Sequence, residues 1–452
     1  MENLYFQLND LPDEILMIIL KNMTNVEVLF SLMDVNKRLN KIVHDETFTN
    51  YLTFLVCSSD SSVHRYCDSL IDRFCLQILP SIHHKIQWLN LEASSMKRIL
   101  FATDYPNLRG LGLYNVDDET VKYVFNVYRF DECLYLLDGR FNQLHTFYVS
   151  ILAILPLWSE INQQVELRNL KCFSLYCESK TYNYDELIVP LLHRMLNLEE
   201  LDLYLQIIRF DKGFIDGNNM KKNIINRMPR LNKFIFNIRS IILSLQKQIN
   251  LPSNEDIQQT FKDFQENQII SSVDYFSEEG EGQCHVYSYP YTMQHYHGIT
   301  NNFSGGLFEY VYDVSLFDER PFQHEFFLRI SQSFPFMRSL SLTNNKPQND
   351  KLCHRLNDND HNLSVIKYLH LNELILHTAH DDYIEQFLVD TKTYLQNDIY
   401  LSIKYESLQR VTRNFSRNTT RINCAKLSYI GFIRKPEFLP NLSNYFPHAE
   451  IL

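Results

Sequence analysis

One short apolar pattern, apolar-x-x-apolar-x-apolar, returns along most of the chain from residue 86 onward. The last two apolar positions of each copy are two residues apart, which is the spacing of side chains on one face of a β-strand. A short strand buries little surface alone, so neighbouring copies and the segments between them must cover its apolar face. The copies begin at Ile86, Leu108, Leu144, Leu170, Leu198, Leu231, Val311, Met337, Leu371 and Cys424, with a partial copy at Leu401 and Ile403.

The intervals between the copies indicate stacked units of a strand and a helix. The middle residues of successive copies are mostly 22–36 residues apart, with one interval of 80. Helical patterns fill several intervals, for example from Phe326 to Ile330 before the copy at Met337. The pattern is similar to leucine-rich repeats, whose period is about 20–29 residues. This resemblance implies an α/β fold in which residues 86–452 form an irregular solenoid, or horseshoe. An ordinary α/β domain with buried strands is the alternative.

The interval of 80 residues predicts an insertion at about 239–306. A capping-box pattern at 253–256 precedes apolar residues at helical spacing, which indicates a helix. Two further segments, 273–276 and 284–287, flank a Glu/Gly-rich turn at 278–282 and predict a β-hairpin. The insertion is therefore expected to be a helix followed by a hairpin.

The N-terminal segment predicts three short helices that need a partner. Leu11-Pro12-Asp13-Glu14 opens the first helix, because proline is tolerated in a first turn and acidic residues suit the positive end of the helix dipole. The next six residues, 15–20, are all apolar, so every side of this helix must be covered. Apolar spacing indicates further helices at 26–33 and 37–44. Three helices in so short a segment bury little surface, so a partner is expected.

Residues 8–48 resemble an F-box. The pattern of that family is a Leu-Pro-x-Glu opening, an aliphatic helix, and a Val-x-Lys segment before a third helix. The sequence departs from it at Leu39, where many members carry Trp. In that family the motif docks onto the Skp adaptor of a cullin–RING ubiquitin ligase. The residues that carry the resemblance are Leu8, Leu11, Pro12, Glu14, Leu16, Ile19, Leu20, Leu29, Leu32, Val35, Lys37, Leu39 and Ile42.

The resemblance implies that a Skp-type adaptor, and through it a cullin, is a partner of this chain. Residues 49–85 are predicted to form a helical linker to the repeats, with Pro80 ending its helix. An unrelated helical cap on the following domain is the alternative interpretation of residues 8–48. The residues expected to form the adaptor interface are Leu11, Pro12, Ile15, Leu16, Ile19, Leu20, Leu29, Leu32 and Val35.

The strand pattern also predicts a surface for a protein target. Side chains that alternate with the buried apolar positions point to the opposite face of the sheet. Tyrosine is enriched at the energetic centres of interfaces, although it is also common in strands of any kind. The residues predicted to face the target are Tyr114, Tyr148, Tyr176, Glu200, Asp202 and Tyr204.

A second candidate surface lies near the C-terminus. Between residues 405 and 421, apolar residues recur at helical spacing, and Arg410, Arg413 and Arg417 fall on the opposite side. Arginine binds phosphate and carboxylate through two parallel hydrogen bonds, so these residues predict contact with an acidic or phosphorylated target. The alternative is a solvated outer face of a helix.

The sequence contains none of the common catalytic motifs that we sought, namely a phosphate-binding loop, a dinucleotide fingerprint and a nucleophile elbow. His295-x-His297 and the nearby Cys284-His285 match no standard zinc spacing, so no metal site or cofactor is predicted. The net charge of −11 argues against a nucleic-acid partner. No apolar run is long enough to span a membrane. Nine cysteines without an export signal predict a cytoplasmic or nuclear location.

Together these features favour a non-catalytic substrate-recognition subunit of a Skp–cullin–F-box ubiquitin ligase. In that hypothesis the N-terminal helices bind the adaptor and the repeats bind a protein target. The alternative is a repeat-based interaction scaffold outside any ligase, in which the N-terminal helices only cap the repeats. The identity of the target is not encoded in any motif that the sequence displays.

Overall fold

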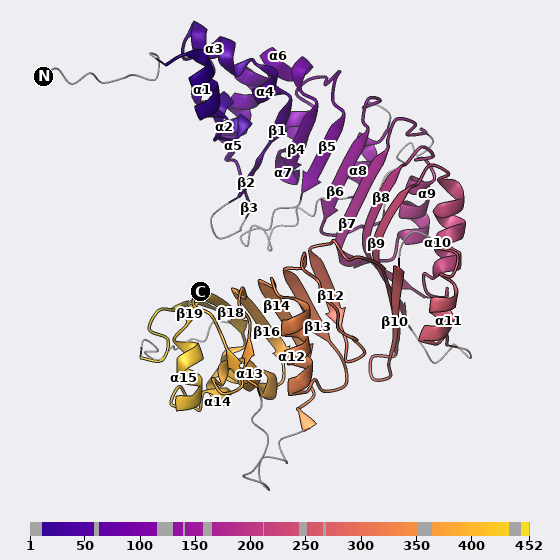
Figure 1. Ribbon diagram of the computed structural model, residues 1–452, viewed down its shortest axis with the longest axis vertical. Coiled ribbons are helices and arrows are strands. Elements are labelled where there is room, and N and C mark those ends of the chain that lie inside the picture. The colour runs from indigo at the N-terminus through magenta and orange to yellow at the C-terminus, as the bar shows by residue number, and fades with distance from the viewer. Residues whose placement is uncertain are drawn as a thin grey trace, which may run out of the picture. The chain divides into compact units, whose positions relative to one another are not determined.

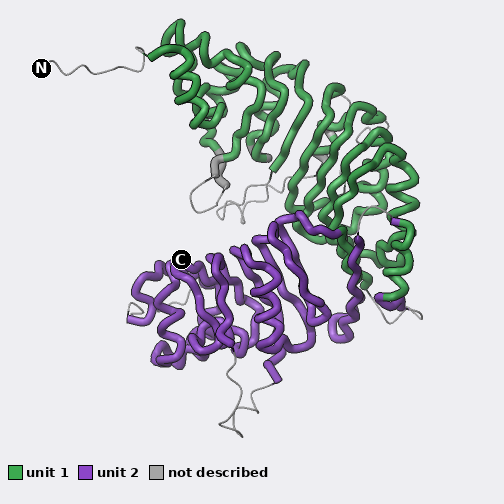
Figure 2. The backbone as a smooth tube through the Cα atoms, in the orientation of Figure 1, with its two compact units in different colours: residues 1–243, 255–263, 284–288 green, residues 244–254, 264–283, 289–452 purple. Residues whose placement is uncertain are grey.

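The chain forms two compact units, which are described separately (Figure 2). Unit 1 comprises residues 1–243, 255–263 and 284–288, and unit 2 comprises residues 244–254, 264–283 and 289–452. Within the described residues, no helix combines the length and apolar character that crossing a membrane requires. The structure is a computed structural model, and it describes residues 11–57, 63–114, 130–138, 141–156, 165–210, 212–243, 251–264, 268–349, 364–433 and 444–451.

Four short helices open unit 1, and the first three confirm the sequence prediction (Figure 1). Pro12 directly precedes the first helix, where its missing N–H leaves no hydrogen bond unmade. Thr24 and Glu27 form a capping box, in which each side chain accepts a hydrogen bond from the other residue's backbone N–H. The side chain of Asn36 caps the third helix by accepting from the N–H of Leu39. The helices are α1 (Asp13–Leu20), α2 (Asn25–Leu32), α3 (Lys37–Val43) and α4 (Glu46–Thr49).

Strands that carry successive copies of the repeated pattern in unit 1 pair in parallel, with equivalent positions opposite each other. Leu89 lies opposite Leu111, and Leu111 lies opposite Phe147, so equivalent positions of successive apolar copies stack on one face of the sheet. Within the described residues this sheet has nine strands, and its parallel strands, in their order, are β1 (Tyr51–Thr53), β4 (Trp88–Glu92), β5 (Gly110–Tyr114), β6 (Thr146–Ile151), β7 (Cys172–Thr181), β8 (Glu200–Arg209) and β9 (Lys233–Leu243).

Helical segments between the strands cover the apolar face. Met96 and Ile99 of the helix after β4 are buried, and this helix contacts both β4 and β5. The segments are α5 (Asp68–Arg73), a π-helical turn (Phe74–Ile78), α6 (Leu79–Ile82), a 3₁₀ turn (His83–Lys85), α7 (Ala93–Leu100), α8 (Phe130–Leu136), a second π-helical turn (Tyr184–Ile188), α9 (Val189–Leu192), α10 (Gly217–Asn223), a second 3₁₀ turn (Ile225–Arg227) and α11 (Asn254–Gln259).

The prediction of one helical linker over residues 49–85 is wrong. Strand β1 is hydrogen-bonded to β4 at the edge of the sheet, because Leu52 fills a fully buried position there. Two short antiparallel strands, β2 (Leu55–Cys57) and β3 (Val63–Arg65), precede α5. Pro80 does not end a helix but lies within the continuous helical segment 68–85, just after a π-helical turn.

Unit 2 has its own parallel sheet and its own helices (Figure 1). A separate pair of short parallel strands, β15 (Ile366–Lys367) and β17 (Thr393–Tyr394), lies outside this sheet. The helices are α12 (His324–Ser333), α13 (Asp381–Leu388), α14 (Tyr405–Val411) and α15 (Asn418–Cys424). The strands of the sheet, in order, are β12 (His295–Ile299), β13 (Asp313–Phe317), β14 (Ser339–Asn344), β16 (Glu373–Ala379), β18 (Ile399–Ile403), β19 (Leu427–Phe432) and β20 (Glu450–Ile451).

The apolar positions of the repeated pattern form the cores of both units, with two exceptions. Leu231 is only half-buried. Tyr429 is 45% exposed, because the pairing of β18 with β19 shifts by one residue near its start. Ile430 therefore occupies the buried position that the pattern assigns to Tyr429.

The predicted insertion at 239–306 contains the expected helix and hairpin, but its limits are wrong. Helix α11 is followed by adjacent strands β10 (Gln268–Phe276) and β11 (Glu281–Tyr289), joined by a short turn. Strand β9 continues to Leu243, beyond the predicted start of the insertion. Strand β12 lies before its predicted end, because Tyr296 and Ile299 bury their side chains in unit 2.

Candidate functional site

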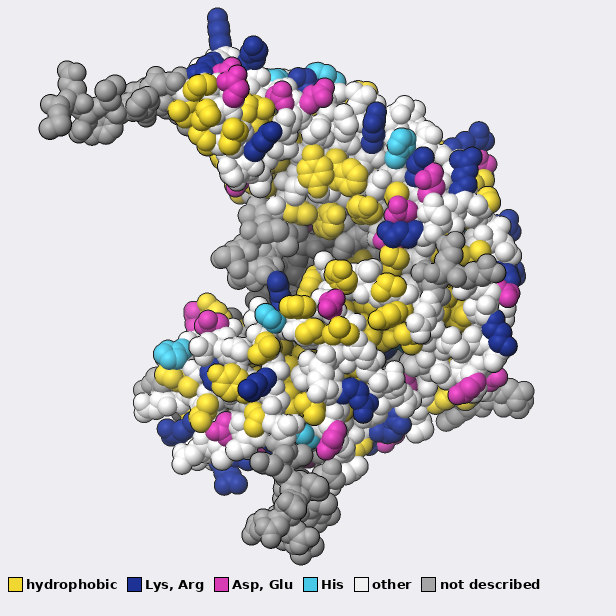
Figure 3. Space-filling model, viewed as in Figure 1, with side chains coloured by type: hydrophobic (Ala, Val, Ile, Leu, Met, Phe, Trp, Pro, Cys, Tyr) yellow, Lys and Arg dark blue, Asp and Glu magenta, His cyan; other side chains and the backbone are white. Residues whose placement is uncertain are grey.

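Large apolar side chains are exposed along one side of α1 and just after it. Ile15, Ile18 and Ile19 are spaced three and four residues apart, so they lie on one face of the helix. With Met23 they form what we call the α1 surface, and their exposed fractions range from 38% to 61%. Figure 3 shows hydrophobic side chains gathered over this helix. Contiguous apolar exposure of this kind is typical of a protein-binding site.

Three apolar residues that the sequence analysis assigned to the adaptor interface point inward instead. Leu16, Leu20 and Leu29 are buried in the core of the N-terminal helices, so they expose little surface to a partner. Leu11 and Leu32 are half-buried, whereas Pro12 and Val35 are exposed. The predicted interface did not include the exposed residues Ile18 and Met23. Ile18 lies three residues after Ile15, so helical spacing could have indicated that the two share one face.

Side-chain hydrogen bonds hold the α1 surface in place. The guanidinium of Arg38 donates through Nε to the carboxylate of Asp13 at 2.7 Å and through a terminal nitrogen to the carbonyl of Leu11. Asn25 donates to the carbonyl of Tyr51 at 2.8 Å, which ties α2 to strand β1. The surface is therefore attached to the sheet of unit 1 through β1. Such preorganisation lowers the entropy cost of binding a partner.

The register of the sheet places the predicted tyrosines on the face opposite the core. Tyr176 lies directly opposite Tyr204, and their rings are 4.7 Å apart between centroids. Tyr148 lies one position earlier on the same face, opposite Gly112. Tyr114, Tyr148 and Tyr176 are half-buried, as expected for a surface that still offers contact area. Tyr204 is only 4% exposed, so it supports this face but offers little of its own surface.

Two aromatic residues that the sequence prediction missed extend this face toward the edge of the sheet. Trp88 stacks on Tyr51 with ring centroids 6.0 Å apart and also contacts Tyr148 at 5.9 Å. Asn90 links them, accepting from the indole N–H of Trp88 and donating to the hydroxyl of Tyr51. We call Tyr51, Trp88, Tyr114, Tyr148 and Tyr176 the aromatic face.

Carboxylates border the aromatic face, as predicted. Glu200 accepts a hydrogen bond from the ammonium group of Lys233 at 3.0 Å. The Oδ1 atom of Asp202 is buried and has no hydrogen-bond partner within the described residues. Burial raises the pKa of the Asp202 carboxyl; Lys233 opposes this increase and Glu200 adds to it. An unpaired carboxylate oxygen is costly to bury, so this group suits a hydrogen-bond donor or a cation from a partner.

The predicted arginine surface is not formed. Helix α14 ends at Val411, and Arg413 follows in a left-handed conformation, so the three arginines do not share one helix. Arg410 forms two hydrogen bonds with the carboxylate of Asp381, at 2.7 and 2.8 Å. Arg417 pairs with Glu385 at 2.9 Å. The charges of Arg410 and Arg417 are thus already compensated by carboxylates of α13.

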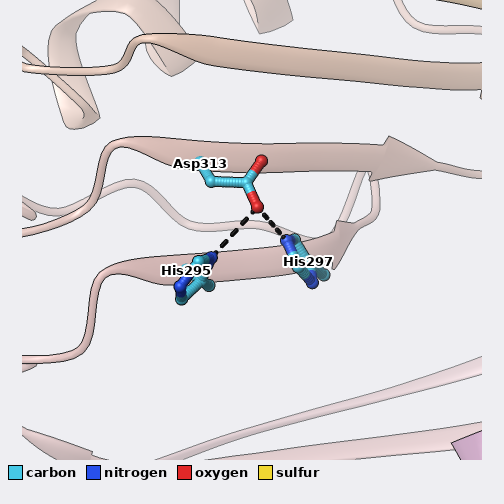
Figure 4. Close-up of side chains that lie close together, drawn as sticks. All are labelled: His295, His297 and Asp313. Atoms are coloured by element: carbon cyan, nitrogen blue, oxygen red, sulfur yellow. Dashed lines mark hydrogen bonds and ion pairs between the residues drawn. The ribbon is translucent and has the colours of Figure 1, made fainter. Parts of the chain in front are cut away.

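Three side chains of unit 2 converge, and only two of them, His295 and His297, are neighbours in the sequence (Figure 4). His295 Nδ1 lies 3.1 Å and His297 Nε2 lies 2.7 Å from Oδ2 of Asp313. Burial raises the pKa of the Asp313 carboxyl, but the hydrogen bonds from both imidazoles lower it well below the ordinary value. The two histidines lie on strand β12. Asp313 lies beside them because β12 and β13 pair in parallel, and the spacing of residues along the sequence does not reveal this pairing.

Comparison with known proteins identifies the N-terminal helices. Residues 8–51 match the family model of the F-box domain. No curated protein matches the chain. F-box domains typically bind Skp-type adaptors, and proteins that contain them are generally non-catalytic adaptors. The chain therefore carries an F-box domain at its N-terminus, which supports a role as an F-box adaptor in complexes of the Skp–cullin–F-box type.

Proposed function

We propose that this protein is a substrate-recognition subunit of a Skp–cullin–F-box ubiquitin ligase, acting in the cytoplasm or nucleus. The observation that carries the proposal is the exposed α1 surface within the matched F-box domain. Burying one such isoleucine against a partner contributes roughly 1.5–3 kcal/mol. In this role the chain performs no covalent step, and it contributes by holding a target close to the ubiquitin-loaded enzyme.

The remainder of the chain suits a leucine-rich-repeat-like domain that binds the target. Its support is the order of the strands, because successive apolar copies become parallel neighbours in each sheet. Helical segments separate many of these strands, as expected of stacked strand–helix units. The solenoid assignment rests on this order and on the sequence pattern.

The aromatic face is the proposed target site in unit 1. Aromatic side chains supply large rigid contact area, and such residues dominate the energetics of interfaces. Asp202 adds a buried carboxylate oxygen without a hydrogen-bond partner within the described residues, and Glu200 lies beside it. A target that places a lysine or arginine side chain among aromatic residues would satisfy both features. The proposed target is therefore a protein segment with an exposed basic residue.

Binding of the adaptor can be tested with one substitution on the α1 surface. Ile18→Asp places a charge where an apolar contact is expected, and Ile18 is exposed enough for the fold to tolerate it. We expect calorimetric affinity for a purified Skp-type adaptor to fall by at least about 30-fold, which corresponds to roughly 2 kcal/mol for a central interface residue. Leu76→Asp is the control, because Leu76 is 77% exposed and lies outside this surface.

Wild-type affinity of Ile18→Asp would disprove the proposed interface. A wild-type protein that binds no Skp-type adaptor and co-purifies with no cullin would favour the scaffold hypothesis.

The target site needs a separate test by affinity capture and mass spectrometry. Proteins that bind wild type and Tyr429→Ala but not Tyr148→Ala would support the aromatic face, since Tyr429 is an exposed tyrosine of unit 2. Equal capture by all three would contradict it.

A further inference from the structure

We infer that His295, His297 and Asp313 form a binding site for a divalent transition-metal ion of the zinc type on the sheet of unit 2. The three ligand atoms lie within 4.8 Å of one another, and both imidazole nitrogens point at the same carboxylate oxygen (Figure 4). This inference does not depend on the proposed ligase function.

The local backbone explains why these three side chains meet. His295 and His297 are two residues apart on β12, so they share a face, while Tyr296 between them is buried in the core. His295 pairs in register with Asp313 of β13. The register then shifts at Gly298, whose φ of +63° favours glycine, and Ser315 accepts the N–H of Gly298 at 2.7 Å. The shift lies between Tyr296 and Ile299, and His297 within this interval also directs its Nε2 to Asp313.

The donor set determines the class of ion. Two imidazole nitrogens and one carboxylate oxygen suit Zn²⁺ and its neighbours among the first-row metals. Calcium and magnesium prefer oxygen ligands alone and are not expected. With metal–ligand bonds of about 2.0–2.2 Å, tetrahedral ligand atoms lie roughly 3.3–3.5 Å apart. The observed separations of 3.1 and 2.7 Å from Asp313 are shorter than this, so the carboxylate would move away from the imidazoles by a few tenths of an ångström to admit an ion.

The site is accessible and has fewer protein ligands than a closed structural zinc site. All three side chains are half-buried, so an ion can enter and water can occupy the remaining position. Without an ion, the same atoms are held by N–H···O hydrogen bonds from each histidine to Asp313. To bind a metal, each of these nitrogens would give up its proton, which passes to the other nitrogen of the same ring or to solvent. The fold thus positions the ligands before the ion arrives.

The test uses the full chain, stripped of metal with a chelator and titrated with Zn²⁺ in a calorimeter. We expect one equivalent of Zn²⁺ to bind. His297→Gln and Asp313→Asn should each lower the affinity by at least about 10–100-fold, because removing even a residue that only supports a metal ligand causes a loss of that size. His377→Gln is the matched control, since His377 lies on β16 of the same sheet and bonds to Ser402. Thermal unfolding without metal checks that each variant is folded.

Cobalt separates this site from the cysteines of the chain. Co²⁺ bound by nitrogen and oxygen should give visible absorption without the near-ultraviolet charge-transfer band of a thiolate ligand, and Asp313→Asn should reduce it. Asp313→Asn keeps the shape of the side chain, so it remains informative if His297→Gln unfolds. The inference is overturned if the folded Asp313→Asn variant binds Zn²⁺ as wild type does, if a thiolate band accounts for the signal, or if no equivalent binds.

Discussion

At the scale of single residues, two glycines shape the aromatic face by the side chains they lack. A Cβ atom at Gly110 would lie 2.0 Å from Cε3 of Trp88, so the indole occupies the space above strand β5. Tyr114 similarly lies above Gly112, where an added Cβ would be 2.7 Å from its ring. The stacking of Trp88 on Tyr51 therefore depends on glycine at position 110.

Gly110→Ala is expected to displace the indole and to destabilise the protein by about 1–3 kcal/mol, the usual cost of overpacking. Urea unfolding followed by circular dichroism measures the stability, and tryptophan fluorescence in a Trp158→Phe background reports on the environment of Trp88. Gly213→Ala is the control, because an added Cβ there meets no atom within 4 Å. Equal stability of the two variants would show that the indole is not held over β5.

Asp202 is predicted to favour binding at the expense of stability. Its folded pKa is raised above the ordinary 3.8, so its contribution to stability is full below that value and is lost as the pH rises through the folded pKa. At neutral pH, Asp202→Asn should therefore stabilise the protein by about 0.5–2 kcal/mol while weakening target capture. Urea unfolding should show this gain at neutral pH and none at a pH below 3.8. A destabilised variant at neutral pH would contradict the sign.

The facing of individual residues was predictable from the sequence, but their accessibility was not. Alternation along β8 correctly placed the side chain of Tyr204 on the other face of the sheet from that of the core residue Leu203. It could not show that Tyr204 would be covered, because that depends on neighbours such as Tyr176 on the adjacent strand. Asp313 was missed as a companion of His295 for the same reason. Contacts across strands depend on register, which a single strand does not encode.

At the scale of elements, the sequence predicted those helices and strands whose buried apolar residues recur at a regular spacing of a few residues. The strands of the repeated pattern formed because each has one apolar face and turn residues around it. Strand β1 was missed because its partner, β4, lies far along the chain. Helix α14 was predicted to run too far, since Arg413, Asn414 and Phe415 all adopt positive φ values. Arginine and phenylalanine rarely adopt that conformation, so spacing alone could not reveal it.

The capping box of α2 should matter to the F-box as a whole. Thr24→Ala removes the hydroxyl that accepts the N–H of Glu27 at 3.2 Å, and we expect a loss of about 1 kcal/mol in unfolding free energy. Chemical denaturation measures this loss. Thr24→Ser keeps the hydroxyl and should restore most of the stability. If the serine and alanine variants are equally stable, the cap does not stabilise α2.

At the scale of the whole molecule, the sequence correctly indicated mixed α/β structure with an N-terminal F-box. It predicted one continuous repeat domain, whereas the chain divides into two compact units, each with a series of parallel strands. The division at residues 243 and 244 falls inside the predicted insertion. The interval of 80 residues located this irregularity. The pattern could not show where pairing resumes, because β12 does not carry the repeated apolar motif.

The role of β1 predicts where the F-box can be removed. A variant that begins at residue 49 keeps the edge strand and the buried side chains Leu52, Phe54, Phe74 and Ile78. A variant that begins at residue 86 loses all of these and leaves β4 as an unpaired edge, which favours aggregation. We expect cooperative thermal unfolding near that of the full chain for the first variant. The second should lose several kcal/mol, since even one buried large side chain contributes about 2–5 kcal/mol. Equal melting temperatures would show that β1 is not part of the fold that supports the repeats.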